Sequence, residues 1–314
     1  MMLEQYEAID RHRECPQYMI TRETYIEADI TDSLKNLWRA HNTRIPGDTS
    51  LLDVKRAIAQ RMALHCEFCE RRCGVDRRKE QGQCGVQKSK IASEGAHYGE
   101  ESVLVPSHTM FFSGCNFHCA YCQNWDISQV PSGRWIPPEQ LARIIEARNL
   151  RNMNFVGGDP TPNLHYILEV LRTCNSSVPV VWNSNMYLTE ESMNLLEGVV
   201  DVYLTDFKYG NNQCAAELSQ VPRYWDIITR NHLLAQENAD LIIRHLVLPD
   251  HVGCCTQPIL EWIASNLDDP AVNVMFQYRP EYRALETPRI DRFLTGEEKK
   301  RALEIAREYN ISLI

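Results

Sequence analysis

The 314-residue sequence contains no run that approaches roughly 18 consecutive apolar residues, which excludes an ordinary membrane-spanning helix. It has no internal repeat, low-complexity tract or Gly/Ser-rich linker, so nothing in it marks a repeated unit or a flexible tether. Its first residues lack the basic-then-apolar pattern of a secretory signal. We therefore expect a cytoplasmic protein with no membrane partner.

Basic residues are fewer than acidic ones. Lys and Arg number 33 against 42 Asp and Glu, which gives a net charge of −9 and argues against phosphate-driven binding of nucleic acid. The local basic run Arg71, Arg72, Arg77, Arg78 and Lys79 is interpreted as a solvated loop. A hydrophobic fraction of 44% excludes a wholly disordered chain, and the length suits one large domain or two.

Cysteine is the residue type in excess. The chain has 12 cysteines, and most of them fall in two spaced groups between Cys66 and Cys122. Because the cytosol keeps thiols reduced, such grouping indicates metal ligation rather than disulfides.

From residue 109 onward, short β-branched or aromatic runs alternate with amphipathic ones, which predicts six strand-then-helix units and a parallel sheet. The strands are expected at 109–113, 152–156, 179–183, 200–207, 241–248 and 272–278, and the helices at 137–148, 163–174, 189–196, 224–236, 258–266 and 295–309. This predicts an α/β fold, a partial (β/α)6 barrel, with a doubly wound sheet as the alternative. In both, the functional face lies at the carboxyl ends of the strands.

The predicted organisation has three parts. Residues 1–64 form a mainly helical extension with one helix over 51–64, residues 65–108 a cysteine-rich metal-binding segment, and residues 109–314 the barrel.

The first cysteine group, Cys115, Cys119 and Cys122, has C-x3-C-x2-C spacing and follows the first predicted barrel strand. Three thiolates can hold three irons of a four-iron cluster and leave the fourth iron open for another ligand. The alternative is a zinc site completed by His118 or a distant residue.

This triad, with Tyr121 just before its last cysteine, resembles the signature of the radical S-adenosylmethionine (SAM) superfamily. Further matches follow in order at successive strand ends: Gly157-Gly-Asp-Pro160, Asn183-Ser-Asn185, Asp206-Phe-Lys208 and Arg244-His-Leu-Val-Leu-Pro249. The set is similar to pyruvate formate-lyase activating enzymes, and most of all to their PflX-like branch. The resemblance implies a 4Fe-4S cluster on the three cysteines and SAM bound to its open iron.

The resemblance also assigns roles around the cofactor. Gly157 and Gly158 would let backbone approach it closely, and Lys208 and Arg244 would donate hydrogen bonds to its carboxylate or ribose oxygens. Asp206 would accept from the ribose, orient Lys208 or help to hold a cation. The implied cofactor-binding residues are Tyr121, Gly157, Gly158, Asp159, Pro160, Asn183, Ser184, Asp206, Lys208 and Arg244.

The second group, Cys66, Cys69, Cys73 and Cys84, has C-x2-C-x3-C-x10-C spacing. Four such thiols can bind zinc or a further iron–sulfur cluster, and the sequence does not decide between them. Among the other cysteines, Cys174 is expected in the core, whereas a ligand, redox or hydrogen-donor role stays open for Cys214, Cys254 and Cys255. None of His97, His108, His245 and His251 has metal-ligand spacing.

These patterns lead to one main hypothesis: a radical SAM oxidoreductase that abstracts hydrogen from a protein or peptide, such as a glycyl radical enzyme. A ferredoxin or flavodoxin would supply low-potential electrons. Alternatives are a radical enzyme that modifies another peptide or RNA and, more distantly, a non-catalytic iron–sulfur electron carrier.

Overall fold

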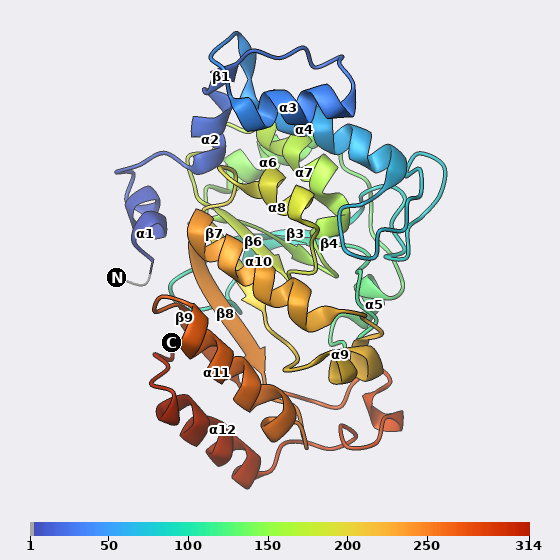
Figure 1. The fold of residues 1–314 in the computed structure, drawn as a ribbon, viewed down its shortest axis with the longest axis vertical. Helices are drawn as coiled ribbons and strands as arrows, with labels where there is room; N and C mark the ends of the chain where they lie inside the picture. Colours follow the sequence, from blue (N-terminus) through green and yellow to red (C-terminus); the bar gives the residue numbers. More distant parts are fainter. Residues whose placement is uncertain (1–2) are drawn as a thin grey trace.

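The computed structural model describes residues 3–314, and its centre is a seven-stranded sheet in the order β3-β4-β5-β6-β7-β8-β9 (Figure 1). Neighbours from β4 to β9 pair in parallel, whereas β3 pairs antiparallel with β4 at the edge. The strands are β3 (Ile91–His97), β4 (Ser107–Phe112), β5 (Met153–Gly157), β6 (Val180–Ser184), β7 (Val202–Asp206), β8 (Asp240–Leu246) and β9 (Ala271–Met275).

Each parallel strand has the next one along the chain as its neighbour. A doubly wound sheet would reverse its strand order at one point, and this sheet does not. The prediction of six parallel strands in a partial barrel is therefore confirmed. The edge strand β3 was not predicted, and it brings residues of the segment 65–108 into the sheet. The boundaries between the three predicted parts of the chain remain a prediction.

Helices connect the parallel strands. They are α5 (Trp125–Ser128), α6 (Pro138–Arg148), η2 (Thr161–Asn163), α7 (Leu164–Thr173), α8 (Glu190–Leu196), α9 (Asn212–Ser219), α10 (Tyr224–Asn238), η3 (Val252–Thr256, a π-helix) and α11 (Gln257–Asn266). After the last strand, β9, the chain forms η4 (Ala284–Glu286) and α12 (Gly296–Glu308). The six predicted helices are all present, and the short α5 and α9 are additional.

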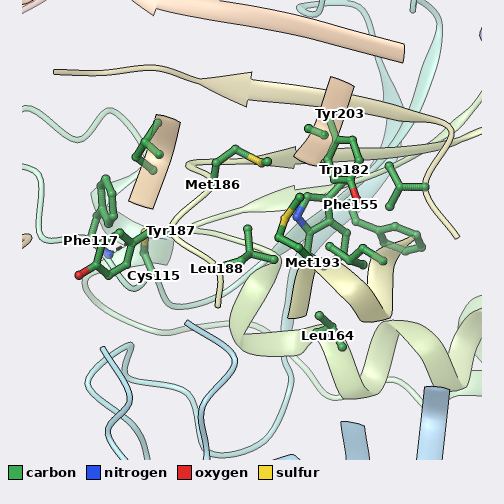
Figure 2. Close-up of a cluster of buried hydrophobic side chains, with 14 of the residues drawn as sticks. Cys115, Phe117, Phe155, Leu164, Trp182, Met186, Tyr187, Leu188, Met193 and Tyr203 are labelled. Carbon is green, nitrogen blue, oxygen red and sulfur yellow. Dashed lines mark hydrogen bonds between the residues drawn. The ribbon is translucent and has the colours of Figure 1, made fainter. Parts of the chain in front are cut away.

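Large side chains fill the space between the sheet and its helices (Figure 2). Phe155, Trp182 and Tyr203 come from the neighbouring strands β5, β6 and β7, and Leu164 and Met193 come from the helices that follow two of these strands. All five are at most 1% exposed. Their burial holds the strands in register, so the loops at the carboxyl ends of the strands have a rigid base.

The N-terminal extension lies against the barrel. It comprises α1 (Glu4–Asp10), α2 (Gln17–Arg22), β1 (Tyr25–Ile26), α3 (Leu34–Thr43), β2 (Thr49–Ser50), α4 (Leu51–Met62) and η1 (Ala63–His65). Helix α4 confirms the helix expected over 51–64; it packs on α3 and on α7 of the barrel, and these helices lie together at one end of the view in Figure 1. Within the described residues, no helix is long and apolar enough to cross a membrane.

Candidate active site

A cavity of about 420 Å³ opens at the carboxyl ends of the parallel strands. The three cysteines Cys115, Cys119 and Cys122 line it, and so does every predicted cofactor-binding residue except Pro160. Pro160 instead precedes the 3-10 turn η2, where its carbonyl accepts the Asn163 amide at 2.8 Å. The predicted site residues, which are up to about 130 positions apart in the sequence, thus line one cavity, and its volume suits a small cofactor.

The thiols of the triad are held by hydrogen bonds from their surroundings. The sulfur of Cys115 accepts the Phe117 amide at 3.3 Å, and that of Cys119 accepts the Ser219 hydroxyl at 2.9 Å. Burial raises the pKa of the Cys115 thiol well above its usual value and that of Cys119 to about 11, although the ammonium of Lys208 opposes the second shift. Buried thiols of this kind become thiolates when a metal coordinates them.

Asp159 organises the loops under the cavity. Its carboxylate accepts the amides of Thr161 and Asn185, both at 2.9 Å, and the hydroxyl of Ser184 at 3.1 Å. Burial raises the pKa of Asp159, while these hydrogen bonds act in the opposite direction. Since both oxygens are engaged by the chain itself, Asp159 ties the loop after β5 to the loop after β6.

Gly157 and Gly158 lie against the backbone of the chain itself, whereas a cofactor was the expected neighbour. A Cβ at Gly157 would lie 2.2 Å from the backbone of Phe112, and a Cβ at Gly158 would lie 2.1 Å from the carbonyl oxygen of Gly114. Gly157 also has a φ of +128°. Glycine is therefore needed for the loop after β5 to pack on the end of β4 and the triad loop, besides any approach to a cofactor.

Three charged residues at the ends of β7 and β8 face the same cavity. The Lys208 ammonium lies 2.7 Å from a carboxylate oxygen of Asp206, so Asp206 orients Lys208 as one of its expected roles requires. The Arg244 guanidinium is already bound to Glu101, at 2.8 and 2.6 Å, and to Glu100. The sequence reasoning missed this glutamate pair because nothing in its loop between β3 and β4 has a motif spacing.

An asparagine pair is the second missed feature. The Asn185 amide donates to the side-chain oxygen of Asn116 at 2.7 Å, and its nitrogen lies 3.8 Å from the Cys115 sulfur. The Asn116 amide nitrogen is buried without a partner and is a free donor beside the thiols. Asn185 belongs to the Asn183-Ser-Asn185 motif at the end of β6, so the sequence could have predicted that its side chain lies near the triad.

His118 does not complete the triad. Its Nδ1 lies 2.8 Å from the side-chain oxygen of Gln129, and the ring lines a separate cavity. Within residues 3–314, no set of three or more Cys, His, Asp or Glu that includes a triad thiol has all its ligand atoms within 4.8 Å of one another. The sulfurs around a single tetrahedral zinc ion lie about 3.8 Å apart, so the three triad thiols do not have the arrangement of a zinc site.

The upstream group lies next to the triad. Its segment, residues 66–90, forms neither helix nor strand, and the Cys84 carbonyl accepts the Cys115 amide at 3.1 Å. The guanidinium of Arg77 is buried, with Nη1 3.5 Å from the Cys66 sulfur and 3.6 Å from the Cys84 sulfur. The interpretation of Arg77 as part of a solvated loop is therefore wrong, because its charge faces thiols.

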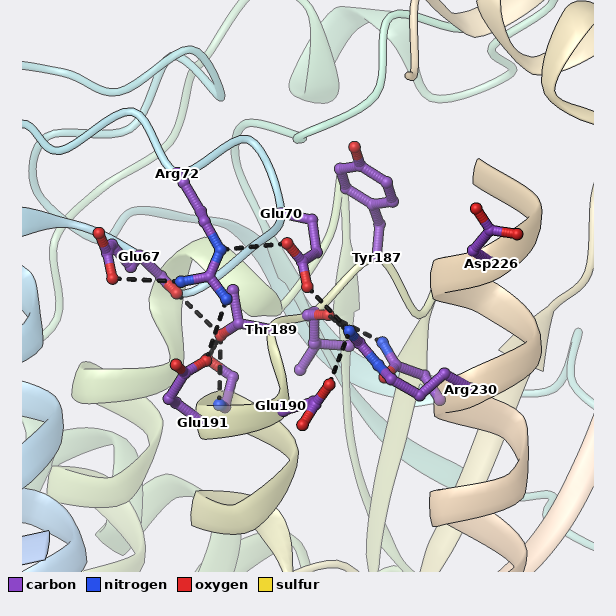
Figure 3. Close-up of polar contacts among 12 residues, drawn as sticks. Glu67, Glu70, Arg72, Tyr187, Thr189, Glu190, Glu191, Asp226 and Arg230 are labelled. Atoms are coloured by element: carbon purple, nitrogen blue, oxygen red, sulfur yellow. Dashed lines mark hydrogen bonds and ion pairs between the residues drawn. The ribbon is translucent and has the colours of Figure 1, made fainter. Parts of the chain in front are cut away.

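Ion pairs anchor this segment to the barrel (Figure 3). Arg72 contacts Glu70 at 3.1 Å and Glu191 of α8 at 3.2 Å, while Arg230 of α10 contacts Glu70 at 3.0 Å. The Thr189 hydroxyl donates to the Glu67 carbonyl at 2.8 Å. The upstream cysteines thus sit on the same rigid frame as the triad.

The remaining cysteines lie outside the cavity. Cys174 is fully buried in the core, as expected. Cys214 and Cys254 lie together with His251, and the ligand atoms of the three are within 4.8 Å of one another. His251 has no metal-ligand spacing in the sequence, but the fold places it beside two thiols.

The donor set therefore fits the implied cofactors. The three thiols, of which those of Cys115 and Cys119 are buried, border the cavity, and the Lys208 ammonium group faces it. Cys115, Cys119 and Cys122 would hold a 4Fe-4S cluster, and Lys208 offers a donor to an anionic group of a small molecule.

Comparison with known proteins gives the following similarities. The family model of the radical SAM superfamily matches residues 109–263. The uncharacterized protein MJ0674 of Methanocaldococcus jannaschii is 49% identical, over 100% of this chain and 99% of that protein. The 7-carboxy-7-deazaguanine synthase of Methanothermobacter thermautotrophicus is 23% identical, over 64% of this chain and 85% of that protein.

Solved structures share less sequence. Streptococcus suis SuiB bound to the precursor peptide SuiA matches with a TM-score of 0.49 and 12% identity, over 98% of this chain and 60% of SuiB. A domain of the pyruvate-formate lyase-activating enzyme from Bacteroides vulgatus matches with a TM-score of 0.42 and 16% identity, over 52% of this chain and 97% of that domain.

Proposed function

Because the chain belongs to the radical SAM superfamily, a family of enzymes, we propose that it cleaves SAM reductively and uses the product radical to abstract hydrogen from a protein or peptide. The observation that carries the proposal is the triad of thiols at the edge of a cavity of about 420 Å³. Cys115, Cys119 and Cys122 would hold the 4Fe-4S cluster, which when bound would supply the one electron needed to cleave SAM between the sulfonium sulfur and C5′ into methionine and a 5′-deoxyadenosyl radical.

The chain's own residues bind and orient the cofactor. The Lys208 ammonium, fixed by Asp206 at 2.7 Å, is placed to donate to a ribose or carboxylate oxygen. Asp159 fixes the loops after β5 and β6, so that Asn183 and Ser184 keep their places on the cavity wall.

The choice of a protein or peptide substrate rests on the Asp206-x-Lys208 motif, which resembles that of activating enzymes. In this proposal a glycyl radical enzyme is the partner, and a ferredoxin or flavodoxin is the electron donor. Abstraction of a hydrogen atom converts the radical to 5′-deoxyadenosine and leaves the new radical on the partner, so SAM is consumed.

We further propose that Cys66, Cys69, Cys73 and Cys84 hold a second iron–sulfur cluster. The thiols of Cys66 and Cys73 are joined by a hydrogen bond, but no three of the four thiols lie within 4.8 Å of one another in residues 3–314. The hydrogen bond from Cys115 to the Cys84 carbonyl places the two cysteine groups side by side. A cluster here would be within reach to pass electrons to the triad.

A simple electron carrier is the competing function. It would need the thiols but not the cavity, nor the ion pair of Lys208 with Asp206 that faces it. These features favour an enzyme over a carrier.

The test is SAM cleavage by full-length protein with reconstituted clusters, reduced without oxygen. We expect 5′-deoxyadenosine from the wild type and none above background from Cys115→Ala, Cys119→Ala or Cys122→Ala, because each change removes one ligand. The Cys174→Ala variant, which alters a core thiol outside both groups, controls for general destabilisation. Wild-type protein that holds its clusters but forms no 5′-deoxyadenosine would contradict the proposal.

A further inference from the structure

Cys214, His251 and Cys254 form a compact cluster on the loops that follow β7 and β8. Their ligand atoms lie within 4.8 Å of one another, and they are the one such group of three among the described residues. The sulfurs of Cys214 and Cys254 are 3.8 Å apart. Two thiolates bound to one zinc ion at about 2.3 Å, in tetrahedral geometry, would be separated by about the same distance.

The backbone brings the two thiols together in a specific way. Asn211 caps the first turn of α9 by accepting the Cys214 amide at 2.8 Å, and its side-chain nitrogen donates to the Cys254 carbonyl, also at 2.8 Å. A Cβ at Gly210 would lie 2.6 Å from the Cys254 carbonyl oxygen, so this close contact requires glycine. One asparagine and one glycine therefore fix the loop after β7 against the π-helix η3.

The hydrogen bonding of the His251 imidazole leaves one ring nitrogen available to a metal. Its Nδ1 lies 2.6 Å from the Pro249 carbonyl oxygen, which can only accept a hydrogen bond. The proton of the neutral ring is thus on Nδ1, and Nε2 keeps a free lone pair. Such a hydrogen bond from the second ring nitrogen is the usual support of a histidine bound to zinc. The ring is 2% exposed, so it is shielded from bulk water.

Cys255 lies next to this group. It is 1% exposed and its side chain is hydrogen-bonded to Cys214, but its sulfur is not among the ligand atoms that lie within 4.8 Å of one another. Two thiols and one imidazole supply three of the four ligands of a tetrahedral zinc ion.

We propose that Cys214, His251 and Cys254 bind a single thiophilic divalent cation, with Zn²⁺ as the best match to this ligand set. Each thiol gives up its proton to solvent when the ion binds, and no oxidation or reduction is involved. The proposal does not depend on SAM chemistry, since the ligands lie outside the cavity.

The site would fix α9 at one end, and the other end of α9 holds the triad loop. The amides of His118 and Ala120 donate to the carbonyls of Ser219 and Leu218, at 3.0 and 2.8 Å. The Ser219 hydroxyl also donates to the Cys119 sulfur. An ion bound at the first turn of this eight-residue helix would therefore stabilise the position of the triad loop.

The first test measures zinc per chain by mass spectrometry in full-length protein loaded with Zn²⁺ without oxygen and freed of loosely bound metal. We expect Cys214→Ser and Cys254→Ser to hold about one equivalent less than the wild type, and Cys174→Ser to match the wild type. Equal zinc content in all four proteins would overturn the proposal.

A second measurement uses only the wild type and so does not depend on how the variants fold. Alkylation of each thiol is followed by peptide mass spectrometry before and after Zn²⁺ loading. We expect Zn²⁺ to protect Cys254 while the exposed Cys15 reacts equally in both samples. Equal labelling of Cys254 in the two samples would overturn the proposal, and so would a disulfide between Cys214 and Cys254 in protein kept free of oxygen.

Discussion

At the scale of single residues, Arg77 has the least expected environment in the molecule. It is 4% exposed, and its Nη1 faces the sulfurs of Cys66 and Cys84 at 3.5 and 3.6 Å. A buried guanidinium needs anionic neighbours, and thiolates can provide them. A hydrogen bond from the Cys66 thiol lowers the pKa of Cys73 to about 5.

A cluster with four thiolate ligands carries net negative charge, and Arg77 would compensate part of it. We therefore expect Cys66→Ala to lose about one cluster's worth of iron and acid-labile sulfide, while the electron paramagnetic resonance signal of the triad cluster still responds to SAM. The measurement is iron, sulfide and zinc per chain of reconstituted protein, with Cys174→Ala as the matched control. Wild-type protein that holds zinc instead of iron at this group would contradict the prediction.

Asp159 shows what sequence can and cannot say about one residue. The Gly157-Gly-Asp-Pro160 motif predicted its place at the cavity, and the structure puts it there. The motif did not predict that both carboxylate oxygens would accept hydrogen bonds from the loops after β5 and β6. Those donors are the amides of Thr161 and Asn185 and the hydroxyl of Ser184, and their positions depend on the pairing of two strands.

At the scale of elements, the close packing of the loop after β5 on the loop after β4 can be tested directly. Gly158 lies against the Gly114 carbonyl, with room for a hydrogen but not for a methyl group. We expect Gly158→Ala to lower the free energy of unfolding by roughly 1–3 kcal/mol, because the loop after β5 must move away from the triad loop. The measurement is urea unfolding of the full chain, together with iron bound per chain after reconstitution.

Gly95→Ala is the matched control. Gly95 lies in the edge strand β3, and a Cβ there would meet nothing within 4 Å. We expect its stability to stay within about 0.5 kcal/mol of the wild type. Equal stability and iron content in the Gly158 and Gly95 variants would show that the strand ends are less tightly packed than the structure indicates.

The elements differ in how far the sequence could predict them. The parallel strands are buried and rich in β-branched or aromatic residues, so their positions were predicted to within a few residues. Strand β3 contains Ser93, Glu94 and Gly95 and has no continuous apolar face, and it forms because β4 offers an open edge. Helix α9 is short; Asn211 caps its first turn and Gln220, in the left-handed conformation, ends it. Its buried side packs on the triad loop, which the local sequence does not show.

At the scale of the whole molecule, the N-terminal extension is part of the barrel's packing rather than an appendage. The Tyr6 amide donates to Asp240 at 2.7 Å, the Gln17 amide to Asp201 at 2.9 Å, and the Tyr18 hydroxyl to the Ser176 carbonyl at 2.5 Å. The sequence predicted helical character here but no contacts, because they join residues more than 150 positions apart and leave no periodic pattern.

Among the contacts of the N-terminal extension, that of Lys55 in α4 has the highest desolvation cost, because it buries a charged group. Its ammonium is fully buried, 3.0 Å from the His41 ring and 2.8 Å from the Asn194 carbonyl at the end of α8. Burial lowers the pKa of Lys55 from 10.5 to about 7. Between pH 7 and pH 10 the unfolded chain therefore binds a proton at this residue that the folded chain does not bind, so rising pH favours the folded state.

We expect the stability of the wild type, relative to Lys55→Met, to rise by roughly 2 kcal/mol between pH 7 and pH 9. The neutral methionine has the same bulk and no titration, so the comparison cancels the other groups that ionise over this range. Urea unfolding at the two pH values measures the difference, and Lys35→Met, which removes an exposed lysine of α3, should show no change with pH relative to the wild type. A difference between wild type and Lys55→Met that stays constant with pH would mean that the buried amine keeps its charge through its contacts with α3 and α8, and the extension would then be held by an ion rather than by a neutral amine.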